Sequence, residues 1–194
     1  MSLLNTVNSP EDMLKKLLRE GNGIVFENDS QNLSDLVMNF SITANSLRDW
    51  CCKYLNADRD QKKRLNTQWD SVQALKASKD IANSAKHFTI TMYTPTVSGT
   101  IETQSKMVEF YSAGEALKGL SELKSDSSKI GQSERVTPSF LINFTDGSHL
   151  TLYEFYSGCI RAWLKFFDDN AIPKSDSLKE QLIYLHIKVW PQLA

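Results

Sequence analysis

Hydrophobic residues recur at helical spacing in five stretches of the chain, at residues 9–20, 30–56, 67–87, 153–169 and 175–190. The stretch at 30–56 is the clearest, because apolar side chains three and four residues apart form one continuous stripe there. The sequence Gly-Asn-Gly at residues 21–23 predicts the end of the first helix, and residues 24–26 predict a short strand or an extended link. Residues 56–64 are charged and predict a connection or a short helical turn.

The hydrophobic spacing changes to two residues in the middle of the chain. Residues 88–94 alternate and are rich in β-branched and aromatic side chains, so they predict a strand that ends at Pro95, and residues 106–111 predict a weaker one. Residues 137–144 and 149–152 predict a hairpin, because Asp146-Gly147 between them favours the positive backbone angles of a tight turn. Residues 114–132 are rich in serine, lysine and glycine and predict a mobile loop.

This order of elements predicts an α+β fold, with a bundle of about five helices and a small antiparallel sheet of three to four strands. A chain of 194 residues is the usual size of a single domain. We expect one domain over 1–194, with a helical part at 9–87 and 153–190 and a β part at 88–152. The predicted core contains Phe40, Leu47, Leu75, Ile81 and Trp163.

The charge and composition of the chain do not indicate a particular class of function, although they argue against some partners. The chain has 22 lysine and arginine residues against 23 acidic residues, so no overall charge favours nucleic acid or an anionic membrane. No signal peptide and no run of about 18 apolar residues is visible. We therefore expect a cytoplasmic protein without a membrane partner.

The usual signatures of metal and cofactor sites are also missing. Three cysteines without repeated spacing and three histidines predict neither a disulfide framework nor a metal site. The glycine-rich phosphate loops and the common hydrolase motifs do not occur, so we expect no cofactor.

The strongest local feature is a polar face at the end of the third predicted helix. Asp80, Asn83 and His87 are three and four residues apart, so they share one face, and Lys86 lies beside it. One interpretation is structural, with Lys86 and His87 at the negative end of the helix dipole and Asn83 bonded to a neighbouring helix. The other interpretation is a binding site, with His87 and Asn83 as candidate catalytic residues.

A second polar strip lies on the long helix at residues 30–56, where Asn39, Asp49 and Trp50 are candidate binding residues. If this helix and the next pack antiparallel, the end of one lies beside the start of the other. Our hypothesis is that Asn83 and His87 meet Asp49 and hold the two helices in register. The small residues of the third helix permit such a close approach.

Residues 39–50 and 80–88 together resemble a group of uncharacterised bacterial proteins of about this length. The shared pattern is N-x(9)-DW in the first segment, followed by D-x-A-N-x-x-K-H in the second. The second segment also has a distant resemblance to the HEPN superfamily, whose helical domains often act as dimeric, metal-independent ribonucleases. Asn83 and His87 match two residues of the HEPN motif, but Ala82 stands where the motif has an arginine that stabilises phosphate charge.

Three functions are consistent with these patterns. The one we favour is a non-catalytic interaction or regulatory module that acts through a homodimer or a protein partner. The HEPN resemblance implies instead a ribonuclease of a toxin or antiphage system with a degenerate motif, and RNA is a partner only in that case. A small-ligand binding domain between bundle and sheet is the third. A pocket lined by Asn39, Asp49, Asn83 and His87 would favour the second or third, and a filled contact between helices would favour the first.

Overall fold

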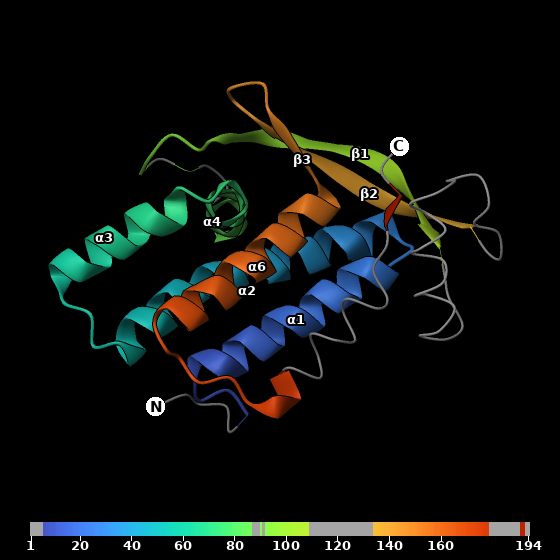
Figure 1. Cartoon of the computed structure of the whole chain (residues 1–194). Coiled ribbons are helices and arrows are strands. Elements are labelled where there is room, and N and C mark those ends of the chain that lie inside the picture. The colour runs from blue at the N-terminus through green and yellow to red at the C-terminus, as the bar shows by residue number, and fades with distance from the viewer. Residues whose placement is uncertain (1–5, 87–89, 91, 109–133, 179–190, 193–194) are drawn as a thin grey trace, which may run out of the picture.

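The computed structural model describes residues 6–86, 90, 92–108, 134–178 and 191–192. Within them, helices pack together and a sheet covers one side of the helical layer, so the α+β prediction is confirmed (Figure 1). The longer helices are α1 (Pro10–Phe26), α2 (Ser30–Tyr54), α3 (Arg59–Asp70), α4 (Gln73–Lys86) and α6 (Leu152–Asp169). The strands are β1 (Val97–Val108), β2 (Glu134–Phe144), β3 (His149–Thr151) and β4 (Pro191–Gln192).

Three of the helices begin with a capping box, in which two side chains satisfy backbone groups reciprocally. In α1 the Ser9 hydroxyl accepts from the Asp12 amide at 3.2 Å, and the Asp12 carboxylate accepts from the Ser9 amide at 3.0 Å. Asp58 opens α3 and Thr151 opens α6 in the same way. These caps fix the helix starts, and the start at Ser9 agrees with the sequence prediction.

The predicted end of the first helix at residues 21–23 is wrong, because α1 continues to Phe26. A Cβ at Gly21 would lie 3.3 Å from the Ile160 side chain and 3.5 Å from that of Phe40, so this glycine permits close helix packing. Ile24 and Val25 are buried within the helix, and their predicted strand is wrong for the same reason. Burial against neighbouring helices outweighs the low helix propensity of glycine.

The predicted helix at residues 67–87 is two helices, and the predicted connection at 56–64 already contains the start of α3. The chain turns at Ser71, whose hydroxyl donates to the Gln68 carbonyl at 2.6 Å. The turn lets Trp69 enter the core, where its ring lies 5.4 Å from that of Trp163. Tertiary packing therefore interrupts a segment whose residues are individually compatible with one helix.

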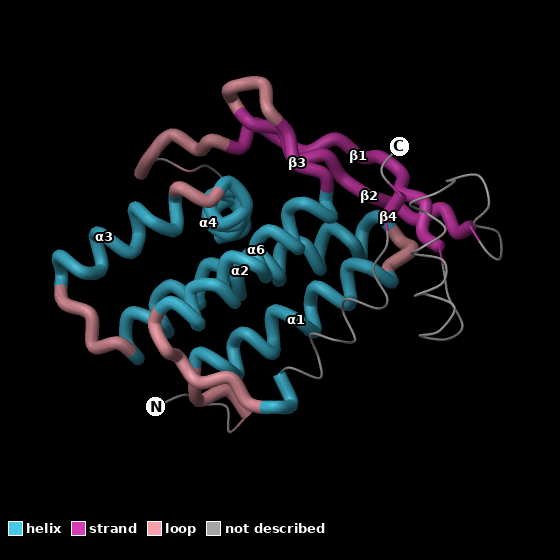
Figure 2. The backbone as a smooth tube through the Cα atoms, viewed as in Figure 1, coloured by secondary structure: helices cyan, strands magenta, loops and turns pink. Residues whose placement is uncertain are grey.

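The described strands form an antiparallel sheet in the order β3-β2-β1-β4 (Figure 2). The β2–β3 hairpin is confirmed, and Gly147 in its turn has a φ of 85°. The predicted strand at 88–94 is wrong for the residues of this segment that are described, because Ile90 and residues 92–94 lie in no strand and β1 begins only after Pro95. Residues 109–111, the predicted loop at 114–132 and most of the predicted last helix lie outside the described residues.

The hydrophobic core lies mainly within the helical bundle and extends to the inner face of the sheet. Four of the five predicted core residues are fully buried, and Ile81 is half-buried at the margin of the core. From β2, Phe140, Ile142 and Phe144 face inward. α2 lies between α1 and α4, and α6 runs beside them under the hairpin (Figure 1).

Candidate functional site

Asp80 is a buried carboxylate that holds the segment between α4 and β1. Its side chain is 3% exposed. Oδ2 accepts from the Thr96 amide at 2.7 Å, the Thr96 hydroxyl at 2.8 Å and the Val97 amide at 3.1 Å. Oδ1 accepts from the Tyr93 hydroxyl at 2.8 Å. The carboxylate is thereby engaged through both oxygens.

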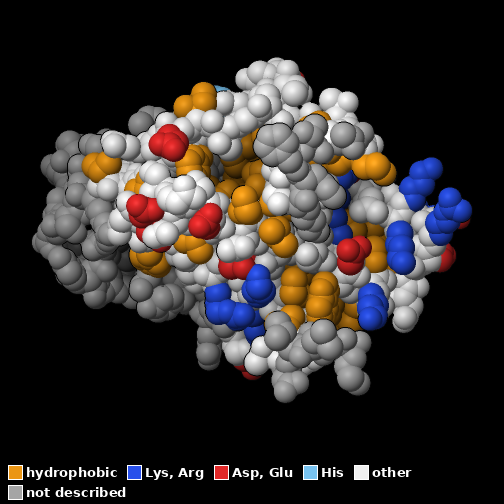
Figure 3. All heavy atoms as spheres, turned by 180° about the vertical axis from the view of Figure 1, so that it is seen from behind, with side chains coloured by type: hydrophobic (Ala, Val, Ile, Leu, Met, Phe, Trp, Pro, Cys, Tyr) orange, Lys and Arg blue, Asp and Glu red, His pale blue; other side chains and the backbone are white. Residues whose placement is uncertain are grey.

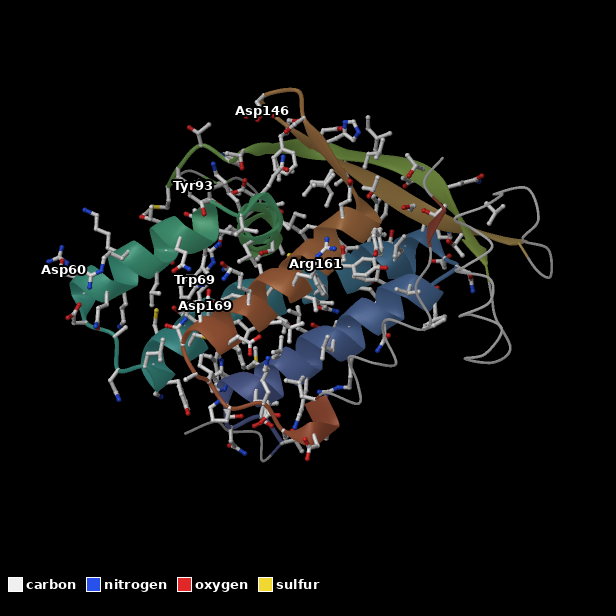
Figure 4. All side chains as sticks on the ribbon, in the orientation of Figure 1. Asp60, Trp69, Tyr93, Asp146, Arg161 and Asp169 are labelled. Atoms are coloured by element: carbon white, nitrogen blue, oxygen red, sulfur yellow. The ribbon has the colours of Figure 1, made fainter. Side chains whose placement is uncertain are left out.

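Asn83 acts on the same segment, because its side-chain amide donates to the Tyr93 hydroxyl at 2.9 Å. In Figure 4, Tyr93 lies near the corner between α3 and α4, below the path of the chain to β1. Burial and then the neighbouring Asp80 raise the pKa of Tyr93 to about 12, so this hydroxyl keeps its proton at neutral pH. The Lys79 ammonium lies 5.2 Å from the centre of the Tyr93 ring.

The register of α2 against α4 separates Asp49 from Asn83. Arg48, next to Asp49, donates to the Leu75 carbonyl at 3.0 Å, near the start of α4. Asn83 is eight residues further along α4, which corresponds to roughly 12 Å. The predicted contact between Asn83 and Asp49 is therefore wrong, and Asn83 bonds Tyr93 instead.

The remaining predicted residues do not gather into one site. Asn39 and Asp49 are exposed, and Trp50 is half-buried against the core. The side chain of Lys86 and all of His87 lie outside the described residues. The contact between α2 and α4 is filled by buried side chains such as those of Ala44, Leu47 and Ala77.

A network around Arg48 was not predicted from the sequence. This side chain is 8% exposed, donates to Asp70 at 2.6 Å and lies 5.7 Å from the centre of the Trp69 ring. Lys79 donates to the other oxygen of Asp70 at 2.7 Å. Burial raises the pKa of Asp70, but the hydrogen bonds from Lys79 and Arg48 outweigh that effect and lower it. The network ties the α3–α4 turn to α2.

A groove of about 360 Å³ lies where α2, α4 and β1 meet, and it is open to solvent on one side. Most of its lining is apolar, from Val37, Met38, Ile81, Ile90, Pro95, Val97 and Phe140. The rest is Ser34, Asp80, Ser84, Ser98, Gly99 and Thr100. Among the described residues of this lining, Asp80 is the only ionisable one, and its carboxylate is bonded to the wall of the groove. We call this site the α2–α4–β1 groove.

The surface views agree with an apolar site. Seen from behind, hydrophobic side chains gather in the middle of the surface with acidic side chains beside them, and basic side chains lie below them and toward one side (Figure 3). Met38, on the rim of the groove, is 42% exposed. The described surface therefore offers an apolar recess without a free ionisable group inside it.

Other chemistry has little support among the described residues. They contain no cluster of three histidine, cysteine or acidic side chains arranged for a metal ion. The three cysteines are buried, and burial raises the pKa of Cys51 to about 12, so this thiol is not a ready nucleophile. None of the described helices is long and apolar enough to cross a membrane.

Comparisons with protein-family models, with curated proteins and with solved structures find no match to this chain. The groove and the Asp80 cluster are therefore interpreted from their own geometry.

Proposed function

We propose that this protein is a non-catalytic interaction module that binds a hydrophobic segment of a partner protein in the α2–α4–β1 groove. The observation that carries this proposal is an open, mostly apolar recess in which the one ionisable residue described, Asp80, is already bonded to the wall. Its volume of about 360 Å³ is at the low end of the range of small-molecule sites, which is roughly 300–1,000 Å³. A few hydrophobic side chains of a protein segment would fill it.

The lining favours recognition by shape and apolar burial. Met38 is flexible and partly exposed, and methionine is common on surfaces that adapt to several partners. Serine and threonine residues at the rim offer hydroxyl groups to a partner backbone. In this proposal Asp80 and Asn83 are positioning residues, since they hold the segment that supplies Pro95 and Val97 to the wall.

The nuclease alternative has less support from these contacts. Asn83, one of its two candidate residues, uses its side-chain amide to bond Tyr93. Ala82, at the position of the motif arginine, is fully buried, so a longer basic side chain has no room there without rearrangement. The small-ligand alternative uses the same groove, and the experiment below separates it from a protein partner.

The test is selection from a library of random peptides about nine residues long, followed by affinity measurements on purified protein. We expect selected peptides to bind, and Met38→Gln to weaken binding by about tenfold or more, because a buried apolar contact is replaced by an amide. Tyr54→Gln is the matched control, because Tyr54 is 47% exposed on the same helix and does not line the groove. Its affinity should equal that of the unmodified protein.

Two results would overturn the proposal. The first is the absence of any selected peptide that Met38→Gln weakens more than Tyr54→Gln does. The second is tight binding of a long-chain fatty acid that blocks the groove in place of any peptide, which would support the small-ligand alternative. Cleavage of single-stranded RNA by the purified protein, without added metal, would favour the nuclease alternative.

A further inference from the structure

We infer that the partner segment binds as an extended strand, which pairs with the free edge of β1 and directs alternate side chains into the α2–α4–β1 groove. This inference rests on the proposed function and specifies the conformation and the charge of the partner.

Among the described residues, the outer edge of β1 is paired only near its end. β1 pairs with β2 along its length except at Ser98, where the register shifts, and on its other side it pairs with β4 only at Lys106 and Met107. From Gly99 to Ser105, no strand in the described part of the chain covers that edge. Seven residues of strand span roughly 24 Å, and alternate residues of such an edge direct their N–H and C=O groups outward.

The free edge and the groove share residues. Gly99 and Thr100 belong to β1, and both also line the groove. Gly99 pairs with Asn143, on the outer face of the sheet, where an added Cβ would meet nothing within 4 Å. A strand added to β1 here would therefore lie at the mouth of the groove, and half of its side chains would face the groove.

The register of the sheet shows which β1 residues face the groove. Thr100 pairs with Ile142 and Glu102 pairs with Phe140, so Thr100 and Glu102 lie on the inward face. Phe140 itself lines the groove. Ile101 points to the opposite face and is 55% exposed. An added strand gains apolar contacts on both faces, in the groove near Thr100 and beside Ile101.

Glu102 determines the charge of the partner. It is exposed and forms no ion pair with another described residue, and it lies next to the groove wall at Phe140. A lysine or arginine opposite Glu102 is favoured, because opposite charges on directly facing strand residues attract. A second copy of this chain, paired through the same edge, would bring a second Glu102 to the joined strands and is disfavoured. We therefore assign the edge to a partner segment with hydrophobic residues around a basic one.

The probe is a synthetic peptide with blocked ends, threonine-threonine-valine-valine-lysine-valine-valine-threonine-threonine. It reads the same in both directions, so its sequence favours neither orientation, and we expect it to bind antiparallel to β1 because antiparallel pairing is slightly more stable per residue. We expect it to bind the protein, measured by fluorescence anisotropy with a terminal dye. N-methylation of one alternate set of its amides should abolish binding, because those amides donate to β1, whereas methylation of the other set should leave the affinity unchanged.

Charge reversal tests the role of Glu102. Glu102→Lys should weaken binding of this peptide by about threefold to tenfold, and a peptide with glutamate in place of lysine should recover it. Asp60→Lys is the matched control, because it reverses one exposed acidic residue on α3, away from the groove (Figure 4). It should not change the affinity.

The outcomes separate the two proposals. Binding that Met38→Gln weakens, but that shows no alternation with N-methylation, would overturn strand addition and leave the proposed function in place. Equal affinity of the lysine and glutamate peptides would overturn the assigned charge. A dimer that forms through β1 and is disrupted by Ile101→Lys would overturn the choice of a partner segment over a second copy. If neither this peptide nor any selected peptide binds, the proposed function itself fails.

Discussion

Replacing Asp80 removes the acceptor for four hydrogen bonds that hold the start of β1 on α4. A hydrogen bond to a charged group contributes about 1.5–3 kcal/mol, but these donors are part-buried and regain some water when the carboxylate is gone. For Asp80→Ala we therefore expect a loss of about 2–4 kcal/mol in the free energy of unfolding. That value is well below the sum of the four individual bonds.

The amide variant tests the geometry more finely. In Asp80→Asn, the remaining oxygen can accept from Thr96 and Val97, but the amide nitrogen then faces the Tyr93 hydroxyl as a donor. Asn83 already donates to the Tyr93 hydroxyl, so the hydroxyl proton, which Asp80 accepts in the unmodified protein, would have no acceptor. One unsatisfied group of this kind costs about 1–3 kcal/mol, so Asp80→Asn should be less destabilising than Asp80→Ala.

Urea unfolding followed by tryptophan fluorescence measures both variants, and Asp60→Ala is the control for loss of an exposed acidic residue. The peptide affinity of both Asp80 variants should fall as well, because the wall at Pro95 and Val97 is released. An Asp80→Ala protein with an unchanged unfolding midpoint would refute the reasoning. A midpoint that drops without any change in peptide affinity would show that the Asp80 cluster stabilises the fold but does not shape the groove.

Three further predictions concern the packing and the ion pairs. Gly158→Ala should lower the free energy of unfolding by about 1–3 kcal/mol, because the new Cβ would lie 2.9 Å from the Cβ of Ala74. Adding Ala74→Gly to the same chain should recover part of that free energy. Asp70 has a lowered pKa in the folded state, so its stabilising contribution is present above its ordinary value of 3.8 and is lost as the pH falls below it. Unfolding midpoints from pH 6 down to about pH 2 should therefore fall less steeply in Asp70→Asn than in the unmodified protein. Arg48→Met should cost about 3–5 kcal/mol, because it leaves the part-buried Asp70 with one of its two cations. It also removes one donor from the Leu75 carbonyl, which keeps the Ser78 hydroxyl at 2.8 Å. An unchanged midpoint would contradict that role.

The sequence predicted the fold class because helical and strand periodicities are local properties. α2, α6 and the hairpin were recognised from spacing and from Asp146-Gly147 alone. The errors occurred where tertiary contacts override local preference. Gly21 remains helical because α1 packs closely there, and the Trp69 side chain enters the core at the break between α3 and α4.

The candidate site was only partly predictable, for a different reason. Spacing correctly placed Asp80 and Asn83 on one face of a helix, but it could not identify Tyr93 and Thr96 as their partners. The register of α2 against α4, which places Arg48 beside Leu75 and so separates Asp49 from Asn83, is a tertiary property that spacing along the chain does not give. The groove combines segments near Met38, Ile81 and Thr100 that are far apart in the sequence, so no local pattern indicates it.

A double-mutant cycle on Asn83 and Tyr93 decides between structure and catalysis at the polar face of α4. If Asn83 is a positioning residue, Asn83→Ala and Tyr93→Phe each cost about 1–2 kcal/mol, and the double variant costs less than their sum, because both single changes break the same 2.9 Å bond. The unmodified protein would then cleave no single-stranded RNA. If Asn83 serves a ribonuclease, Asn83→Ala would abolish a measurable cleavage while the unfolding midpoint stays unchanged, and Tyr93→Phe would not reproduce that loss of cleavage.

His87→Ala belongs in the same experiment, because a general acid or base contributes roughly 10²–10⁴-fold in rate and its loss would be unmistakable. Additive stabilities together with cleavage that depends on both Asn83 and His87 would refute the structural interpretation. We expect the coupled stabilities without cleavage, because the Asn83 amide is already bound to a hydroxyl that Asp80 also orients.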